Sequence, residues 1–238
     1  MSITIKKNDI PNLKKPSFVV DSELHKKLND YEITSLMNKH NFCLFLGKAG
    51  SGKSTLLISL LQSPSMFKNI YHTIICFIPP NSRVSIKNDF WSILPDEQIY
   101  DELNIDNLAE AYQIAEDNAQ LGYKTLIVLD DVQKSLKGEC EKLLLHMVNN
   151  RRHCHLSIWM ACQTYKSIPM QVRMGLTSLF IFKIQKKEMS TIFDEQVEIP
   201  ENVFKDIVKI AFKNSHDFIF IDSNSQKIFL NWDQIIIL

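Results

Sequence analysis

An octapeptide at residues 47–54 constrains the fold of this chain more than any other feature. Its sequence, Gly-Lys-Ala-Gly-Ser-Gly-Lys-Ser, matches the pattern G-x-x-x-x-G-K-[ST] at every fixed position. The preceding segment, Phe42–Leu46, is continuously apolar, as in a buried strand, and the following segment, Ser54–Gln62, has helical spacing. A strand, a glycine-rich loop and a helix in this order are typical of a loop that surrounds phosphate groups.

Glycine usage supports the same interpretation. The chain has only 6 glycines, whereas average usage would give about 17. Half of them, Gly47, Gly50 and Gly52, lie in this loop. Glycine lets backbone N–H groups turn inward around a β-phosphate, and the next helix adds its N-terminal dipole. The alternative is a chance glycine-rich turn, which average usage would produce in about one chain in a hundred.

The motif also predicts individual roles. Lys53 is expected to reach the β- and γ-phosphates, and the Ser54 hydroxyl to complete a Mg²⁺ shell. We therefore expect a nucleotide to be bound by the whole loop, namely Gly47, Lys48, Ala49, Gly50, Ser51, Gly52, Lys53 and Ser54.

Composition excludes several other classes of protein. With 45% hydrophobic residues the chain can form a core, and its longest apolar runs reach about five residues, far below the roughly 20 of a membrane-spanning helix. The N-terminus lacks an apolar signal segment, and the five cysteines show no CxxC spacing. We expect an intracellular protein with reduced cysteines, not a secreted one. The 27 basic and 27 acidic residues argue against a basic nucleic-acid coat, but not against a nucleic-acid partner.

Strands and helices are expected to alternate from Asn41 onward, which indicates an α/β fold with a mostly parallel sheet flanked by helices. After the first strand, further strands are predicted at Thr73–Ile78, Thr125–Leu129, Leu156–Ala161 and Leu179–Phe182. Helices are predicted at Leu103–Gln120 and Gly138–Asn149, and the C-terminal part is predicted as a helix, Val203–Phe212, and a hairpin of Phe218–Ile221 with Lys227–Leu230. Residues 1–40 are interpreted as an N-terminal extension with a short helix near residues 24–28, and residues 41–238 as one domain.

Two acids, Asp130 and Asp131, end the apolar strand Thr125–Leu129. After a phosphate loop, a carboxylate at a strand end is expected to hold the Mg²⁺-bound water, so Asp130 is the predicted metal residue. Asp131 is then placed to activate a water as general base. The alternative is that Asp131 caps a helix that begins near Val132.

The strand Thr73–Ile78 lies in sequence between the phosphate-loop strand and the Asp-Asp strand, a layout that suggests the P-loop ATPases with an inserted central strand. No Asn-Lys-x-Asp guanine signature is present, which favours ATP, and no Leu-Ser-Gly-Gly-Gln stretch is present, which disfavours a transporter cassette.

Other polar residues follow or precede the later strands. Gln163 follows the fourth strand and could contact the γ-phosphate or the lytic water, or could be a turn residue. Arg152 and Arg173 meet no evident local need, so either could reach a neighbouring subunit's γ-phosphate. Their alternative is a surface ion pair or a sheet-edge anchor. The His153-Cys154-His155 triplet lacks zinc spacing and is interpreted as structural.

Taken together, these motifs resemble those of the genome-packaging ATPases of nucleocytoplasmic large DNA viruses and their virophages. These ATPases are the poxvirus-type branch of the FtsK–HerA superfamily. The resemblance covers roughly Asn41 to the C-terminus and extends well beyond the P-loop. The other matching segments are, in order, 80–85, 94–103, 129–131, 151–153, 162–165, Ile168-Pro169 with Arg173, the final helix and 218–222. The combination of Arg-His, a strand, Gln-Thr-Tyr and Ile-Pro-x-x-x-Arg is more specific than the P-loop.

The resemblance implies a RecA-like ATPase that assembles into a homo-oligomeric ring, a pentamer or hexamer, and pumps double-stranded DNA into a preformed capsid. It implies Mg²⁺ and nucleotide at Gly52–Thr55, metal at Asp130, water activation at Asp131, γ-phosphate sensing at Gln163, and a trans role for Arg152 or Arg173. A capsid or inner-membrane portal partner is possible, with action in the host cytoplasm, in a viral factory or in the virion. Many superfamily members carry Asp-Glu where this chain has Asp-Asp.

Two alternatives to a packaging ATPase remain open. One is a helicase or another motor that acts on single strands or protein. The other is a virion structural protein that binds nucleotide without turnover.

Overall fold

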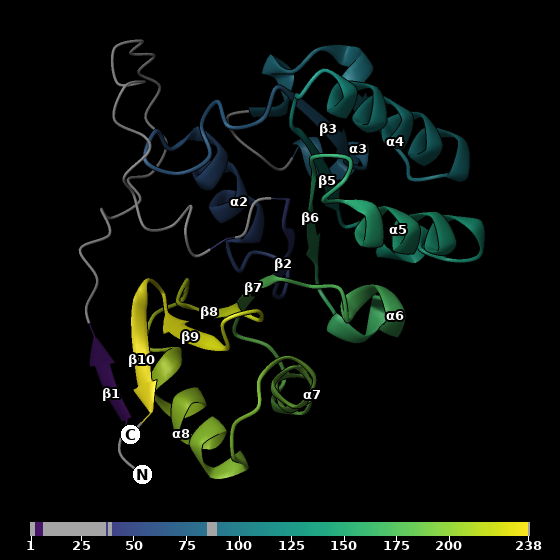
Figure 1. The fold of residues 1–238 in the computed structure, drawn as a ribbon. Helices are drawn as coiled ribbons and strands as arrows, with labels where there is room; N and C mark the ends of the chain where they lie inside the picture. The colour runs from purple at the N-terminus through teal and green to yellow at the C-terminus, as the bar shows by residue number, and fades with distance from the viewer. Residues whose placement is uncertain (1–2, 7–36, 38–39, 85–89, 238) are drawn as a thin grey trace.

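The computed structural model describes residues 3–6, 37, 40–84 and 90–237, and in these residues one ten-stranded sheet carries helices on both faces (Figure 1). The strand order is β1-β10-β9-β8-β7-β2-β6-β5-β3-β4. The short helix predicted near residues 24–28 lies outside the described residues.

The strands are β1 (Ile3–Lys6), β2 (Phe42–Leu46), β3 (Thr73–Phe77), β4 (Ile99–Tyr100), β5 (Thr125–Asp130), β6 (Leu156–Cys162), β7 (Ser178–Phe182), β8 (Phe218–Asp222), β9 (Lys227–Leu230) and β10 (Asp233–Ile237). The α-helices are α2 (Lys53–Gln62), α3 (Pro80–Val84), α4 (Ile105–Gln120), α5 (Glu139–Asn150), α6 (Met170–Arg173), α7 (Lys186–Gln196) and α8 (Glu201–Ala211). The predicted strands and helices of the core and the C-terminal hairpin are confirmed, with ends that shift by a few residues.

The central part of the sheet is parallel, and its C-terminal part is antiparallel. β2 pairs in parallel with β6 and β7, and β5 pairs in parallel with β6 and β3. β8, β9, β10 and β1 continue the sheet from β7 as antiparallel neighbours. The strand inserted between β2 and β5 is β6, which follows β5 in sequence, while β3 lies on the other side of β5. The predicted class with an inserted central strand is therefore confirmed, although chain order alone does not say which strand is inserted.

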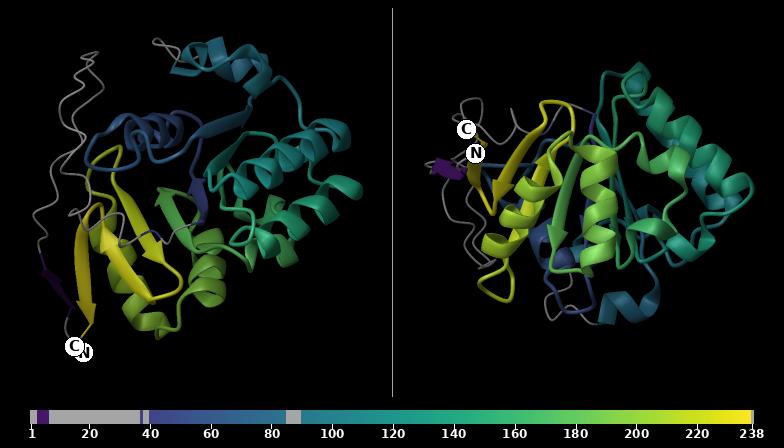
Figure 2. Two further views of the ribbon diagram at one scale, coloured as in Figure 1. Left: turned by 45° about the horizontal axis from the view of Figure 1, so that its top comes forward. Right: turned by 90° about the horizontal axis from the view of Figure 1, so that it is seen from below.

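Alternation along β2 explains why helices cover both faces. Phe42, Leu44 and Leu46 pack into one apolar cluster with residues of α4, α5, α7 and α8, whereas Cys43 and Phe45 pack into a second cluster with α2. Successive side chains of a strand point to opposite faces, so a continuously apolar strand needs cover on both sides. Figure 2 shows α4 and α5 on one side of the central strands and α2 on the other.

Several of the described elements were not predicted from the sequence, among them β4, β10, α3, α6, α7 and β1. α7 begins at Lys186 and Lys187, a pair that reads as a solvated basic surface, but Met189, Ile192 and Phe193 give the helix a buried face. At the other end of the chain, Ile3–Lys6 pairs with β10, so the predicted N-terminal extension contributes an edge strand to the sheet.

Candidate functional site

The phosphate loop, the two acids and Gln163 meet along the carboxyl ends of three adjacent strands, whereas the two predicted arginines do not join them. The phosphate loop follows β2, Gln163 follows β6, and Asp130 ends β5. Register places Leu46 beside Cys162, and Asp130 beside Ala161. Because parallel strands end at the same edge of a sheet, residues far apart in sequence converge there, as is usual for ligand sites of open α/β sheets.

The loop between β2 and α2 requires glycine at its two fixed positions. A Cβ on Gly47 would lie 2.8 Å from the Phe182 Cβ, closer than real carbon atoms approach. Gly52 is the N-cap residue of α2 and has φ of +103°, a conformation that other residues rarely adopt. The loop is thus shaped by backbone, as an anion cradle at a helix N-terminus must be.

The Lys53 ammonium is half-buried beside the acids of the site. Its Nζ donates to the Lys48 carbonyl oxygen at 3.1 Å. Burial lowers the pKa of Lys53, while the nearby charges of Asp130 and Asp131 oppose that shift. The charge therefore lies where it could be shared between these acids and a bound anion.

Asp130 and Ser54 bring a carboxylate and a hydroxyl oxygen together. Asp130 is only 6% exposed, and the Ser54 hydroxyl donates to its Oδ2 at 3.5 Å. Burial, and then the charge of Asp131, raise the pKa of Asp130 to about 6, against the opposing effects of Lys53 and Ser54. A buried carboxylate and a hydroxyl are the hard oxygen donors that suit Mg²⁺.

Asp131 turns its carboxylate toward the neighbouring strand. It has φ of 57°, and its backbone N–H donates to the Ala161 carbonyl oxygen at 2.9 Å. Gln163 Nε2 lies 3.1 and 3.3 Å from the two carboxylate oxygens, and Gln133 Nε2 donates to Oδ1 at 3.1 Å. The following 3₁₀-helix, Gln133–Ser135, has Val132 as its N-cap without a side-chain capping bond, so Asp131 does not cap a helix here.

Gln133 was not singled out from the sequence, although it contacts the same carboxylate as Gln163. Its place two residues after Asp131 carries no signal by itself, because turns commonly contain polar residues. The left-handed backbone of Asp131 brings Gln133 back to the carboxylate, and strand pairing brings Gln163 to it.

Arg173 meets a local need, contrary to the sequence-based expectation. Its guanidinium forms a bidentate pair with Glu195 at 2.7 and 2.8 Å, and Nη1 donates to the Ile168 carbonyl oxygen at 2.9 Å. The guanidinium also lies 5.1 Å from the Tyr165 ring centroid. With its side chain only 12% exposed, Arg173 is an internal anchor of this chain.

Arg151 and Arg152 are adjacent in sequence but differ in their surroundings. Arg151 donates to the carbonyl oxygens of His40 and Val148 and is half-buried, so it too meets a local need. Arg152 is exposed and forms no ion pair with a described residue. It lies between α5 and β6, and therefore at the amino edge of the sheet, away from the phosphate loop of its own chain.

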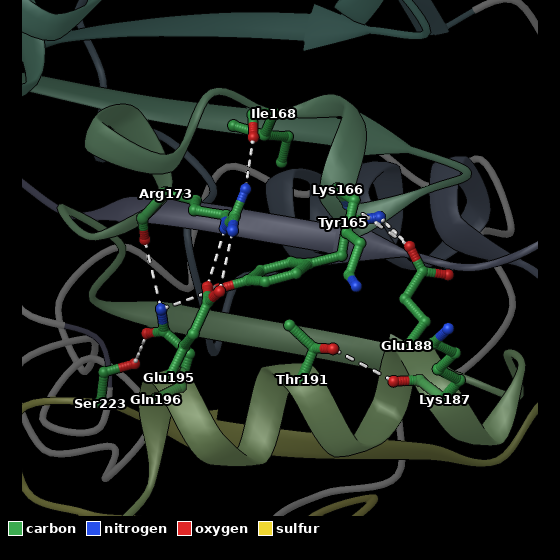
Figure 3. A network of polar contacts seen from close by, with 10 residues as sticks. All are labelled: Tyr165, Lys166, Ile168, Arg173, Lys187, Glu188, Thr191, Glu195, Gln196 and Ser223. Atoms are coloured by element: carbon green, nitrogen blue, oxygen red, sulfur yellow. Dashed lines mark hydrogen bonds and ion pairs between the residues drawn. The ribbon is translucent and has the colours of Figure 1, made fainter.

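A network of polar contacts fastens the segment after Gln163 onto α7 (Figure 3). Tyr165 donates from its hydroxyl to Glu195 at 2.8 Å and from its backbone N–H to Glu188. Gln196 donates to the Tyr165 hydroxyl, and its Oε1 accepts from Ser223 at 3.0 Å, which extends the network to the turn between β8 and β9. Sequence reasoning missed these α7 residues because it missed the helix.

The cysteines and the His153–His155 triplet are structural in the described residues. All five cysteines are buried and free. Cys154 lies 3.4 Å from the Tyr112 hydroxyl, and His155 stacks on His40. The described residues contain no cluster of three or more His, Cys, Asp or Glu able to hold a metal ion, and none of their helices has the length and apolarity needed to cross a membrane.

The sheet order and the glycine loop define a RecA-like P-loop NTPase fold, with a C-terminal helix and hairpin. Solved structures share it at low sequence identity. The genome packaging NTPase B204 from Sulfolobus turreted icosahedral virus 2, in complex with ATP-γS, aligns with a TM-score of 0.60 and 17% identity over 82% of this chain and 98% of that chain. EssC (ATPases 2 and 3) from Geobacillus thermodenitrificans aligns with a TM-score of 0.52 and 13% identity, over 83% of this chain and 39% of that chain.

The chain belongs to the poxvirus A32 protein family, whose sequence model matches residues 28–225. This confirms the resemblance to the poxvirus-type branch. Protein 015R of frog virus 3 is 25% identical over 198 residues, which are 74% of this chain and 59% of that protein. DNA packaging protein OPG160 of variola virus is 27% identical over 143 residues, 58% of this chain and 51% of that protein. The chain thus spans between half and three-fifths of the length of these relatives.

Proposed function

We propose that this chain is an ATP-hydrolysing motor that translocates double-stranded viral DNA into a preformed capsid. The observation that carries the proposal is the convergence of the phosphate loop, Asp130, Asp131 and Gln163 on one sheet edge, with Gln163 bonded to Asp131. Membership of the poxvirus A32 family and similarity to a DNA packaging protein support DNA translocation as the process that uses the energy of hydrolysis.

In this proposal the triphosphate lies in the loop formed by residues 47–55. Backbone N–H groups of the loop and the N-terminus of α2 would hold the β-phosphate. Lys53, whose ammonium bonds the Lys48 carbonyl oxygen in the structure, would exchange that bond for phosphate oxygens, because a charge-assisted bond to an anion is stronger.

The oxygen pair of Ser54 and Asp130 fits Mg²⁺ and would hold it, directly or through water. Mg²⁺ would supply positive charge beside the β- and γ-phosphates. The raised pKa of Asp130 supports the assignment, because a buried carboxylate next to another acid is best stabilised by a cation.

Asp131 is proposed to accept the proton of the attacking water, and Gln163 to orient that water and sense the γ-phosphate. An ionised carboxylate only accepts hydrogen bonds, so it polarises a water bonded to it, while an amide both donates and accepts. Their mutual bonds at 3.1 and 3.3 Å hold the two groups together before ATP arrives.

Arg152 is proposed as the residue that acts in trans, in a ring of five or six subunits. Its exposure at the sheet edge away from its own phosphate loop suits a group that reaches a neighbour's γ-phosphate. Arg173 is instead proposed to position the segment after Gln163. The ring would act in the infected cell, at a capsid or inner-membrane portal.

The test is phosphate release by the purified chain. We expect turnover in the wild type and none in Lys53→Ala or Asp131→Asn, with ATP binding lost in the first variant and retained in the second. Binding without release by an oligomeric wild-type sample would instead support a nucleotide-binding structural protein. Stimulation by single strands and not by duplex DNA would support a helicase-type motor.

A further inference from the structure

His216 lies against the phosphate loop on the side away from the two acids. Its Nδ1 is 3.2 Å from the Ser51 carbonyl oxygen, and a Cβ built on Gly52 would lie 3.4 Å from the same nitrogen. His216 is exposed, and it comes from a segment 165 residues further along the chain. No sequence motif marks it, so only the fold reveals its proximity to the loop.

The segment that carries His216 is held in place. Asp217 accepts from the Asn214 backbone N–H at 2.6 Å and from the Asn231 side chain at 3.2 Å. Asn231 in turn accepts from the Phe218 backbone N–H at 3.0 Å. These bonds tie the turn between α8 and β8 to the turn between β9 and β10, which fixes the position of His216 beside the loop.

The strand order gives the side of the loop on which His216 stands. β2 lies between β6 and β7, and β8 follows β7. β8 is antiparallel, so its first residue, Phe218, pairs with Phe182 at the end of β7. His216 therefore emerges at the same sheet edge as the phosphate loop, on the β7–β8 side, whereas Asp131 and Gln163 stand on the β5–β6 side.

A nucleotide bound as proposed would run in one direction along this sheet edge. With its γ-phosphate toward Asp131 and Gln163 and its β-phosphate in the loop, ATP would extend across the loop to the β7–β8 side, because phosphates, ribose and base follow one another along the molecule. The ribose and adenine would then lie beside His216.

The chemistry of the imidazole suits that neighbour. A carbonyl oxygen only accepts, so Nδ1 donates to Ser51, and in the Nδ1–H tautomer Nε2 is a hydrogen-bond acceptor. Ribose hydroxyls and the exocyclic amine of adenine are donors. We propose that His216 binds the ribose–adenine part of ATP through Nε2, with its position fixed by the Nδ1 bond to the phosphate loop. This inference rests on the proposed function.

Calorimetric titration of the full chain, with Mg²⁺ present, tests the proposal by comparing ATPγS with inorganic tripolyphosphate. In His216→Asn the side-chain amide can still donate to Ser51 but has no atom in place of Nε2. We expect His216→Asn and His216→Ala to bind ATPγS about tenfold more weakly, as for the loss of one hydrogen bond, and to bind tripolyphosphate as the wild type does. The control, His153→Ala at the opposite sheet edge, should bind both ligands normally.

Equal weakening for ATPγS and tripolyphosphate in His216→Asn would overturn the proposal, because His216 would then act only on the shape of the phosphate loop. Unchanged affinity for ATPγS in both variants would overturn it as well. If the wild-type chain does not bind ATPγS at all, the proposed function itself is refuted. The proposed contact between His216 and ATP is then refuted as well.

Discussion

The Gln163 amide lies 3.1 Å from Oδ2 and 3.3 Å from Oδ1 of Asp131, and the two residues directly follow the adjacent strands β6 and β5. The two residues are 32 positions apart in sequence, and the amide contacts both oxygens of the carboxylate. A group that binds the proposed general base from the neighbouring strand can also position the water that this base activates.

We predict that Gln163→Ala lowers kcat for ATP hydrolysis about 10²-fold, the usual effect of losing one donor that acts on the reacting groups. KM should change little, since Gln163 is not part of the phosphate loop. Steady-state phosphate release measures both quantities.

Gln133→Ala is the matched control, because Gln133 also donates to Asp131 but from its own segment. It should retain most of the activity. Equal losses of kcat in the two variants would contradict a specific role for Gln163.

Arg152→Ala should leave ATP affinity and thermal stability unchanged and reduce hydrolysis by about 10³-fold or more, as for an arginine that stabilises transition-state charge in trans. Mixing this variant with Lys53→Ala, which keeps Arg152 but lacks nucleotide, should restore part of the activity at mixed interfaces. Absence of any recovery, or full activity of Arg152→Ala alone, would exclude the trans role.

Arg173→Ala should instead destabilise the fold, because the Glu195 carboxylate would lose its main ionic partner. The side chains of Arg173 and Glu195 are both less than one-fifth exposed, so water would replace that partner poorly. We expect a loss of about 2–4 kcal/mol in the free energy of unfolding, measured by urea denaturation. Lys142→Ala removes a fully exposed pair with Glu139 and should have no measurable effect. Unchanged stability of Arg173→Ala would refute the anchoring role.

The pKa of Asp130 predicts a pH dependence of stability in the metal- and nucleotide-free protein. Burial raises this pKa to about 6, from 3.8 in the unfolded chain. Between pH 3.8 and about pH 6 the Asp130 carboxyl is thus protonated in the folded state and ionised in the unfolded state. The contribution of Asp130 to stability therefore falls as pH rises toward 6 and stays low above it.

Asp130→Asn removes that charge. Its stability relative to wild type should therefore increase by about 2–3 kcal/mol between about pH 4 and pH 7.5, as the pKa difference implies. Urea denaturation in the presence of a chelator measures it. A stability difference that does not vary with pH would show that Asp130 is not strained by its surroundings.

The phosphate loop and the Asp-Asp strand end could be predicted because each is a local pattern tied to one strand. The partners of Arg173 could not be predicted, since Glu195 lies on α7. Charged residues surround the short apolar stripe of that helix, Met189, Ile192 and Phe193, so its helical periodicity is weak in the sequence. The positions of Gln133 and His216 depend on a left-handed backbone and on strand pairing, which leave no periodic signal in the sequence.

The rate of ATP hydrolysis as a function of added duplex DNA, with the oligomeric mass determined on the same sample, tests the central claim most directly. A DNA-translocating motor predicts a ring-sized assembly whose hydrolysis rises severalfold with duplex DNA, is not raised by single strands, and is abolished by Lys53→Ala. Hydrolysis indifferent to duplex DNA in an assembled sample, or stimulated by single strands alone, would contradict it.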